Sequence, residues 1–289
     1  MPTRLEGDFF VSPVYLAGSR TIGDPGLQPL LGLGFTLAHD DLGNAYVTSP
    51  DQCLRLGYLP EGPDNILWKI TAHRHPFDEP EWMATFDAGT PTELVTAFTS
   101  TLADGYRNDP DTTLFSPHQQ MQEGWFPLQD AGWQLDSGRL ITVSTAPDRL
   151  AGLAYSGRFL TRQAELHGDE QRWVLWGGQD GYHSGWCATF TSGVPKPLIA
   201  ATTARLASQD PVLRYGPEIP KLNRSAARIR PVPPPVPTPL EVQRATAARA
   251  RSQGHRLAAT RAVAHTAAGT LSAALPVRTH HRPAAAARL

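Results

Sequence analysis

Cys187 and His183 have the residue types and the spacing that a cysteine nucleophile and its base require. They stand four residues apart, so on a strand both side chains would face the same side. Cys187 also occupies, in a motif that the chain repeats, the place that Met83 holds in the first copy. Free cysteine is commonly a small buried residue, so the pattern favours packing over catalysis for Cys187.

A second group of residues has the chemistry of metal ligands. His73 and His75 share strand parity, and Asp78 and Glu79 follow closely in the sequence. Two imidazole nitrogens and a carboxylate are ligands that a divalent metal accepts. The second half of the chain has no matching pair of histidines, so the favoured interpretation is a solvated turn, and no metal site is predicted.

The established catalytic and cofactor signatures are missing from the sequence. It contains no G-x-S-x-G, no G-x-x-x-x-G-K-[ST] and no H-E-x-x-H motif. Gly32 and Gly34 lack the third glycine of a dinucleotide site. The adjacent acids Asp40 and Asp41 are expected to be exposed turn residues. We therefore predict a noncatalytic protein without a cofactor, a metal or a small-molecule substrate.

The composition limits the class of protein further. The 289 residues include two cysteines, Cys53 and Cys187, which are too few for a disulfide framework. No apolar run reaches the roughly 20 residues of a membrane helix, and the N-terminal residues do not resemble a signal peptide. These features predict a soluble cytoplasmic protein that does not contact the membrane.

Opposite charges are concentrated in different parts of the chain. Residues 1–220 contain 14 basic and 26 acidic side chains, a net charge of −12. Residues 221–289 contain 12 basic side chains and the single acid Glu241, a net charge of +11. An acidic body therefore carries a basic tail, and such a tail favours binding to DNA or another polyanion.

The tail contains three kinds of segment. Residues 216–239 are proline-rich and end in RPVPPPVPTP, which predicts a semi-rigid linker in the polyproline II conformation. Thr238 and Glu241 form a capping box, and the sequence from there to Gly254 favours a helix. Residues 240–289 are therefore predicted to be partly helical and largely disordered. The candidate polyanion-binding residues are Arg244, Arg249, Arg251, Arg256 and Arg261.

A motif of aromatic and turn residues occurs twice. Residues 81–91 read EWMATFDAGTP and residues 185–195 read GWCATFTSGVP, so the matching tryptophans are 104 residues apart. Further matches predict one repeat over residues 1–110 and a second, degenerate repeat over residues 111–215. Two matched acids, each after a proline, are predicted to cap turns through their carboxylates. The defining residues are Pro50, Asp51, Tyr58, Trp82, Phe86 and Pro91, matched by Pro147, Asp148, Tyr155, Trp186, Phe190 and Pro195.

Each repeat has the same order of predicted elements. Short segments that alternate apolar and polar residues predict antiparallel strands. Helical spacing follows over residues 90–107 and again over 195–208, with Thr90 and Glu93 as a capping box for the first helix. The predicted fold class is α+β, with two tandem ββββα repeats whose antiparallel sheets are each packed by one helix. Trp82 and Phe86 share a strand face and should pack beneath that helix.

The first copy resembles a known family. Residues 48–62, TSPDQCLRLGYLPEG, followed by LWKITAH, EWMATF and TPTELVTAF, resemble the SPDY domain of actinobacteria. That domain has no known function and often occurs in tandem, so the resemblance implies an architecture and no activity. The second copy departs from the pattern, because Ala146 replaces Ser49 and the segment TRQAELHGDEQ is inserted before Trp173.

Two functions from different classes remain open. The first is a noncatalytic interaction or regulatory module whose body recognises a protein partner and whose tail attaches to a polyanion. The alternative follows from a similarity of the tandem pattern to the Whirly and Pur-alpha families, which bind single-stranded nucleic acid on a curved sheet. The acidic body disfavours the alternative, because a groove that follows phosphates needs a positive face.

Overall fold

The chain forms two units, which are described separately. The computed structural model describes residues 5–20, 23–62, 65–115, 121–179, 185–233 and 238–252. One unit spans Met1–Val232, and the other spans Pro233–Leu289. Arg256, Arg261 and the segment predicted to be disordered lie outside the described residues. Within the described ranges, no helix has both the length and the hydropathy that crossing a membrane requires.

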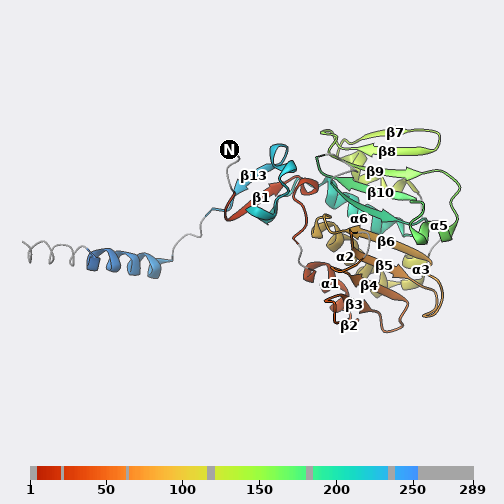
Figure 1. The fold of residues 1–289 in the computed structure, drawn as a ribbon, viewed down its shortest axis with the longest axis horizontal. Helices are drawn as coiled ribbons and strands as arrows, with labels where there is room; N and C mark the ends of the chain where they lie inside the picture. The colour runs from red at the N-terminus through yellow and green to blue at the C-terminus, as the bar shows by residue number, and fades with distance from the viewer. Residues whose placement is uncertain are drawn as a thin grey trace, which may run out of the picture. The chain divides into compact units, whose positions relative to one another are not determined.

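An antiparallel sheet of ten strands dominates the first unit. Its strand order is β2-β3-β4-β5-β6-β11-β10-β9-β8-β7, which runs from the bottom to the top of Figure 1. The last strands of the two predicted repeats therefore lie side by side, and their first strands form the edges. The strands are β2 (Thr36–His39), β3 (Ala45–Thr48), β4 (Leu54–Tyr58), β5 (Ile66–Ala72), β6 (Trp82–Asp87), β7 (Gln134–Ser137), β8 (Ile141–Thr145), β9 (Ala151–Ser156), β10 (Trp173–Gly177) and β11 (Trp186–Phe190).

The helices of the first unit vary in length and lie between the strands in the chain. The longest, α2, follows β6, and α6 follows β11 at the equivalent place. A short helix also precedes each run of strands. The helices are α1 (Asp24–Leu31), α2 (Thr92–Asn108), α3 (Pro110–Phe115), α4 (Phe126–Asp130), α5 (Arg162–His167) and α6 (Lys196–Ala207). The α+β class is therefore confirmed.

The seam between β6 and β11 joins the two halves of the sheet. Phe86 pairs with Ala188, Thr85 with Thr189, and Ala84 with Phe190. The hydroxyls of Thr85 and Thr189 also form a hydrogen bond of 2.7 Å across the seam. The prediction of a separate sheet for each repeat is thus wrong, because the open edges of the two halves satisfy each other's backbone groups.

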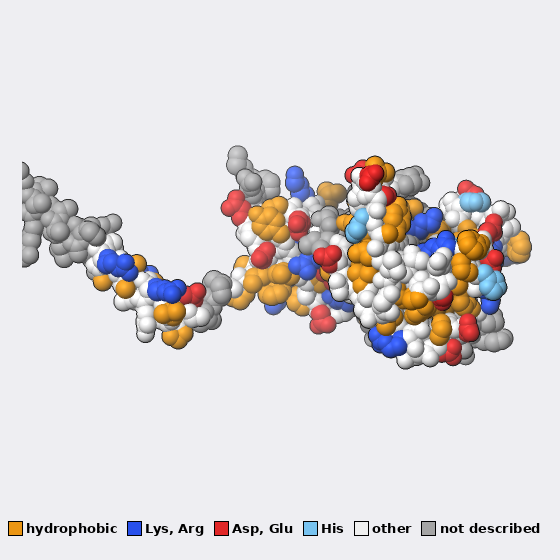
Figure 2. Space-filling view, turned by 90° about the horizontal axis from the view of Figure 1, so that it is seen from below, with side chains coloured by type: hydrophobic (Ala, Val, Ile, Leu, Met, Phe, Trp, Pro, Cys, Tyr) orange, Lys and Arg blue, Asp and Glu red, His pale blue; other side chains and the backbone are white. Residues whose placement is uncertain are grey.

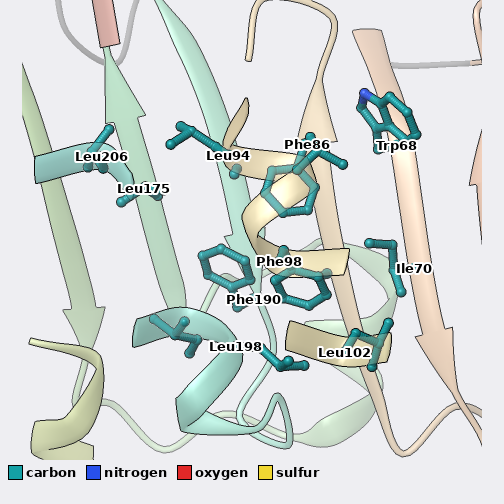
Figure 3. Packing of buried hydrophobic residues seen from close by; sticks show 14 of the residues in the cluster. Trp68, Ile70, Phe86, Leu94, Phe98, Leu102, Leu175, Phe190, Leu198 and Leu206 are labelled. Carbon is teal, nitrogen blue, oxygen red and sulfur yellow. The ribbon is translucent and has the colours of Figure 1, made fainter. Parts of the chain in front are cut away.

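Aromatic packing covers this seam on the helix side of the sheet. Phe98 of α2 stacks on Phe190 of β11, with ring centroids 5.9 Å apart and planes 10° apart. Phe86 of β6 meets both rings edge-on at 5.6 and 5.7 Å, and Figure 3 shows the three rings among aliphatic side chains. Trp82 is 1% exposed and contacts Phe98 as well. The predicted packing of Trp82 and Phe86 beneath the helix is confirmed.

The start of α2 differs from the predicted capping box. Pro91 is the N-cap residue, and no side chain caps the helix. The Thr90 hydroxyl donates to the carboxylate of Asp87 and to the carbonyl of Cys187. Glu93 turns instead toward Arg214. Long-range partners therefore outcompete the local capping pattern.

A small sheet, ordered β12-β1-β13, joins the N-terminal residues to the end of the second predicted repeat and to residues beyond it. Its strands are β1 (Asp8–Ser12), β12 (Val212–Tyr215) and β13 (Arg228–Pro231). Arg214 has no exposed side-chain surface, and it donates to both carboxylate oxygens of Glu93 at 2.6 and 2.7 Å. It also donates twice to the carbonyl of Gly18. Arg214 therefore fastens the small sheet to α2.

The small sheet also corrects the predicted boundaries. β13 and two short 3₁₀ turns, Gly216–Glu218 and Leu222–Ser225, belong to the folded unit, so the linker predicted to begin at residue 216 begins after Val232. Residues 8–12 pair with β12 and β13 and take no part in the sheet of the first predicted repeat. The sequence did not predict the pairing of β13 with β1, because residues 216–232 are rich in prolines and charged residues and so resemble a linker in composition.

In the second unit, residues 239–252 are helical. The predicted capping box is confirmed, because the Glu241 amide donates to the Thr238 hydroxyl and the Glu241 carboxylate accepts from the Thr238 amide. The Glu241 carboxylate accepts hydrogen bonds from both the amide and the hydroxyl of Thr238, and these bonds hold the pKa of Glu241 below its ordinary value. The prolines at residues 234–235 and 237 lie outside the described residues.

Phe98→Ala should lower the free energy of unfolding by about 3–5 kcal/mol, because it removes a fully buried ring that contacts both halves of the seam. Urea denaturation followed by tryptophan fluorescence measures the change. Phe77→Ala is the matched control, since Phe77 is 97% exposed and its loss should change stability by about 0.5 kcal/mol or less. Equal effects of the two substitutions would contradict the importance of the seam.

Candidate functional site

The face of the sheet opposite α2 and α6, called here the open face, carries a cavity over β5, β6 and β11. Side chains alternate along a strand, so the residues between the buried aromatics point to this face. The volume of the cavity is about 500 Å³. The strand residues that line it are Ile66, Lys69, Met83, Thr85, Asp87, Cys187, Thr189 and Phe190.

The opposite wall of the cavity is built by α5 and the residues that follow it. Thr161 caps α5 by accepting a hydrogen bond from the Ala164 amide, and Gly168 ends it with a φ of 81°. Glu165 is 5% exposed and accepts hydrogen bonds from Ser192 and from Arg172. This buried network holds α5 against the ends of β10 and β11.

Asp87 supplies a half-buried carboxylate to the cavity. It accepts hydrogen bonds from the Gly89 amide, the Thr90 hydroxyl and the Cys187 amide at 2.7 to 3.0 Å. Burial raises the pKa of Asp87, and these hydrogen bonds oppose the rise. Asp87 therefore links β6 to β11 and to the loop before α2.

The thiol of Cys187 lies in the same cavity. Burial raises its pKa to about 12, and the charge of Asp87 adds to the effect. The thiol is therefore protonated at neutral pH and is a poor nucleophile. His183, the base considered from the sequence, lies outside the described residues.

The histidines considered as metal ligands have other partners. His73 is 5% exposed, its Nδ1 is 2.8 Å from the Asp78 carbonyl, and its Nε2 is 3.0 Å from the Thr71 hydroxyl. Both ring nitrogens are thus engaged within the fold. Across the parts of the chain that are described, no three His, Cys, Asp or Glu side chains gather as a metal would require.

The residues that define the repeats lie in the core or in turns. Trp82, Phe86, Trp186 and Phe190 are each at most 3% exposed, so none of them offers a stacking surface. Tyr58 and Tyr155 pack against Trp68 and Trp173 at 4.8 and 4.7 Å between ring centroids. Pro91 and Pro195 precede α2 and α6 as N-cap residues.

The predicted turn-capping role of Asp51 and Asp148 is confirmed. Each carboxylate, which follows Pro50 or Pro147, accepts a hydrogen bond of 3.0 Å from the amide two residues later. Asp51 also accepts from the Ser49 hydroxyl. In the second half Ala146 replaces that serine, and the hydroxyl of Tyr15 donates to Asp148 instead at 2.7 Å.

Sequence reasoning missed the surface around α5. Phe77 and Phe159 are 97% and 93% exposed, on the connections β5–β6 and β9–α5. Arg162 joins these connections by donating to the carbonyls of Glu79 and Pro80. The helix itself had a local signal, a threonine before a helix-favouring segment and a glycine after it.

Alkylation tests the protonation of Cys187. With Cys53→Ser, iodoacetamide should modify native Cys187 at pH 8 about a thousandfold more slowly than an unfolded thiol, because far less thiolate is present. The rate should keep rising above pH 9. The same variant in urea is the control and should react at the ordinary rate. A plateau near pH 9 in the native protein would contradict a pKa of about 12.

Comparison with known families identifies two segments of the chain. Residues 48–107 and 145–212 match the family SPDY, described as a domain of unknown function (DUF317). Each segment begins at the last residue of β3 or β8 and extends through α2 or α6. Searches of curated proteins and of solved structures returned no match. The chain is therefore similar to the SPDY domain in these two segments.

Proposed function

We propose that the protein is a noncatalytic interaction module with two binding parts. The folded unit recognises a protein partner, and the C-terminal unit attaches to DNA or another polyanion. The observation that carries the first part is the nearly full exposure of Phe77 and Phe159. The protonated thiol of Cys187 and the engaged ring of His73 support the absence of catalysis.

Phe77 and Phe159 have the properties of interface anchors. Large exposed aromatic side chains are unfavourable in water, and they contribute strongly when a partner covers them. Arg162 ties their two connections together and also forms an ion pair with Glu81 at 3.5 Å. The cavity beneath α5 adds polar groups next to this surface. A protein segment could therefore bury both rings and reach the cavity.

Charge limits the chemistry of that partner. Residues 1–232 contain 18 basic and 26 acidic side chains, a net charge of −8. Complementary potentials accelerate association and exclude partners of like charge. The proposed partner is therefore a basic protein segment with an apolar groove for the two rings.

Selection from a random peptide library against the intact protein tests this surface. Selected peptides should be rich in Lys and Arg, and Phe77→Ala with Phe159→Ala should weaken their binding at least about tenfold. Leu42→Ala is the control, because Leu42 is 67% exposed on another connection and should leave affinity unchanged. Peptides whose affinity ignores both phenylalanines would reject the proposed surface.

The charge of the C-terminal unit supports the second part of the proposal. Residues 233–289 contain eight basic side chains and one acid, a net charge of +7. Arg244, Arg249 and Arg251 are exposed on the helix of residues 239–252, where basic side chains are visible in Figure 2. Such cations bind phosphates with little sequence preference and with strong dependence on salt. Arg256 and Arg261 extend the same proposal beyond the described residues.

The alternative, a single-stranded nucleic-acid platform on the sheet, has less support. It needs exposed aromatics and a positive groove. The repeated Trp and Phe residues are buried, and the repeated tyrosines are half-buried against tryptophans. Among the basic residues of the open-face cavity, Arg172 is already paired with Glu165. Lys69, on β5, is exposed and lines the open-face cavity, so it is the residue there that tests the alternative.

Fluorescence anisotropy with labelled single- and double-stranded oligonucleotides separates these possibilities. In the full chain, replacing Arg244, Arg249 and Arg251 by Ala should weaken binding and reduce the slope of log K against log salt by up to about three. The matched control replaces Arg107, Arg139 and Arg158, which are exposed on the folded unit, and should change the slope little. If Lys69→Ala abolished oligonucleotide binding and the triple variant of Arg244, Arg249 and Arg251 bound as the wild type does, the nucleic-acid platform on the sheet would be favoured and the proposed role of the C-terminal unit would be contradicted.

We propose in addition that the two halves of the sheet are copies of one unit. The unit differs from the predicted ββββα, since each half has five strands before its long helix and a short helix before them. Equivalent details support the proposal. Gln52 and Arg149 share a positive φ of 60° and 61° in matching turns. Pro91 and Pro195 share a φ of −55° before the two helices.

A further inference from the structure

A second cavity lies on the helix side of the folded unit, away from the open face. Its volume is about 330 Å³, and α1, α2, α6 and the residues before α1 form its wall. Arg20 and Arg205 bring positive charge to it. Thr92, Thr96 and Ser100 also line it and recur every four residues along one side of α2. The cavity thus combines guanidinium groups with hydroxyls.

Arg205, near the end of α6, lacks an acceptor for one of its guanidinium nitrogens. Its Nη1 is buried without a hydrogen-bond partner. No described residue forms an ion pair with Arg205. A buried charged donor without an acceptor is costly, and such groups in native proteins normally have a partner. Arg205 Nη1 is therefore a buried donor that an acceptor in the cavity would satisfy.

Glu93, the acid in the cavity wall, is already neutralised. Both of its carboxylate oxygens accept hydrogen bonds from Arg214, which is fully buried behind it. Burial opposes the ionisation of Glu93, but the hydrogen bonds and charge of Arg214 outweigh burial, so the pKa of Glu93 is lowered. The charge of Arg205 also contributes to lowering the pKa of Glu93. With the Glu93–Arg214 pair neutral overall, Arg205 adds positive charge to the cavity.

Phosphate has the geometry that these groups match. A guanidinium donates two parallel hydrogen bonds to a phosphate, and hydroxyl groups can complete its remaining oxygens. Ser100 has no hydrogen-bond partner among the described residues. The Thr96 hydroxyl is used, since it donates to the Thr92 carbonyl at 2.9 Å. Arg205 and Ser100 are therefore the groups that a ligand would engage directly.

We propose that this cavity binds a phosphate group, either as the free anion or on a small organic molecule. The cavity is at the small end of the range for ligand sites, so it suits a phosphomonoester better than a nucleotide. Pro25 and Ala97 give part of the wall an apolar surface that a short carbon chain can contact. The charge of Arg20 contributes attraction from the edge of the site.

Thermal unfolding of the full chain tests the proposal. Sodium phosphate well above its Kd should raise the Tm by about 2–5 °C relative to sodium chloride of equal ionic strength. The same measurement is made with glycerol 1-phosphate. If it raises the Tm more than inorganic phosphate does, and at a lower concentration, the ligand is an organic phosphate and not the free anion. Arg205→Gln should abolish both shifts. Arg107→Gln, an exposed arginine at the other end of α2, should keep them.

A second variant keeps the test decisive if Arg205→Gln does not fold. Ser100→Asp places a carboxylate in the cavity, so it should raise the Tm without ligand and eliminate the response to phosphate. Replacing Arg244, Arg249 and Arg251 by Ala should leave the response intact, because those residues belong to the other unit. Equal responses of wild type and Arg205→Gln, or a response to acetate as large as that to phosphate, would overturn the phosphate site.

Discussion

The pairing of β6 with β11 is the constraint on which the folded unit depends. Through three residue pairs it converts two groups of five strands into one sheet. Without it each group would expose a hydrophobic edge with unpaired backbone groups. Phe98 and Phe190 stack directly over the seam, so hydrogen bonding and apolar burial act at the same place. Stability and architecture are therefore concentrated at the middle of the sheet.

The pairing of β6 with β11 also gives the two faces of the sheet different roles: one is buried beneath the helices, and the other carries polar groups. Since alternate residues of β6 point to opposite faces, burying Trp82 and Phe86 beneath α2 leaves Thr85 and Asp87 on the open face. The open face can then carry polar groups without cost to the core. The insertion that forms α5 covers only one side of this face, which creates a cavity where the sheet would otherwise be flat.

Differences between the halves matter as much as their similarity. The second half contains α5 and Glu165, whereas the described residues between β4 and β5 of the first half include no such helix. Arg214 of the small sheet binds Glu93, near the start of α2. The cavity beneath α5 therefore lies where the two halves of the sheet differ.

The sequence by itself determined the features that neighbouring residues control. The alternation of apolar and polar residues located most of the strands, and the 3.6-residue spacing located α2 and α6. The Thr238–Glu241 capping box and the turns at Asp51 and Asp148 formed as predicted, because the hydrogen-bond partners are at most a few residues apart in the chain. Tertiary structure decided the single sheet, the pairing of β1 with β13, the diversion of Glu93 to Arg214 and the cavity beneath α5. Each of these four features joins segments that lie far apart in the chain. Which distant segments pair depends on the backbone edges and charged groups that each segment leaves without a local partner, and local sequence patterns do not encode that choice.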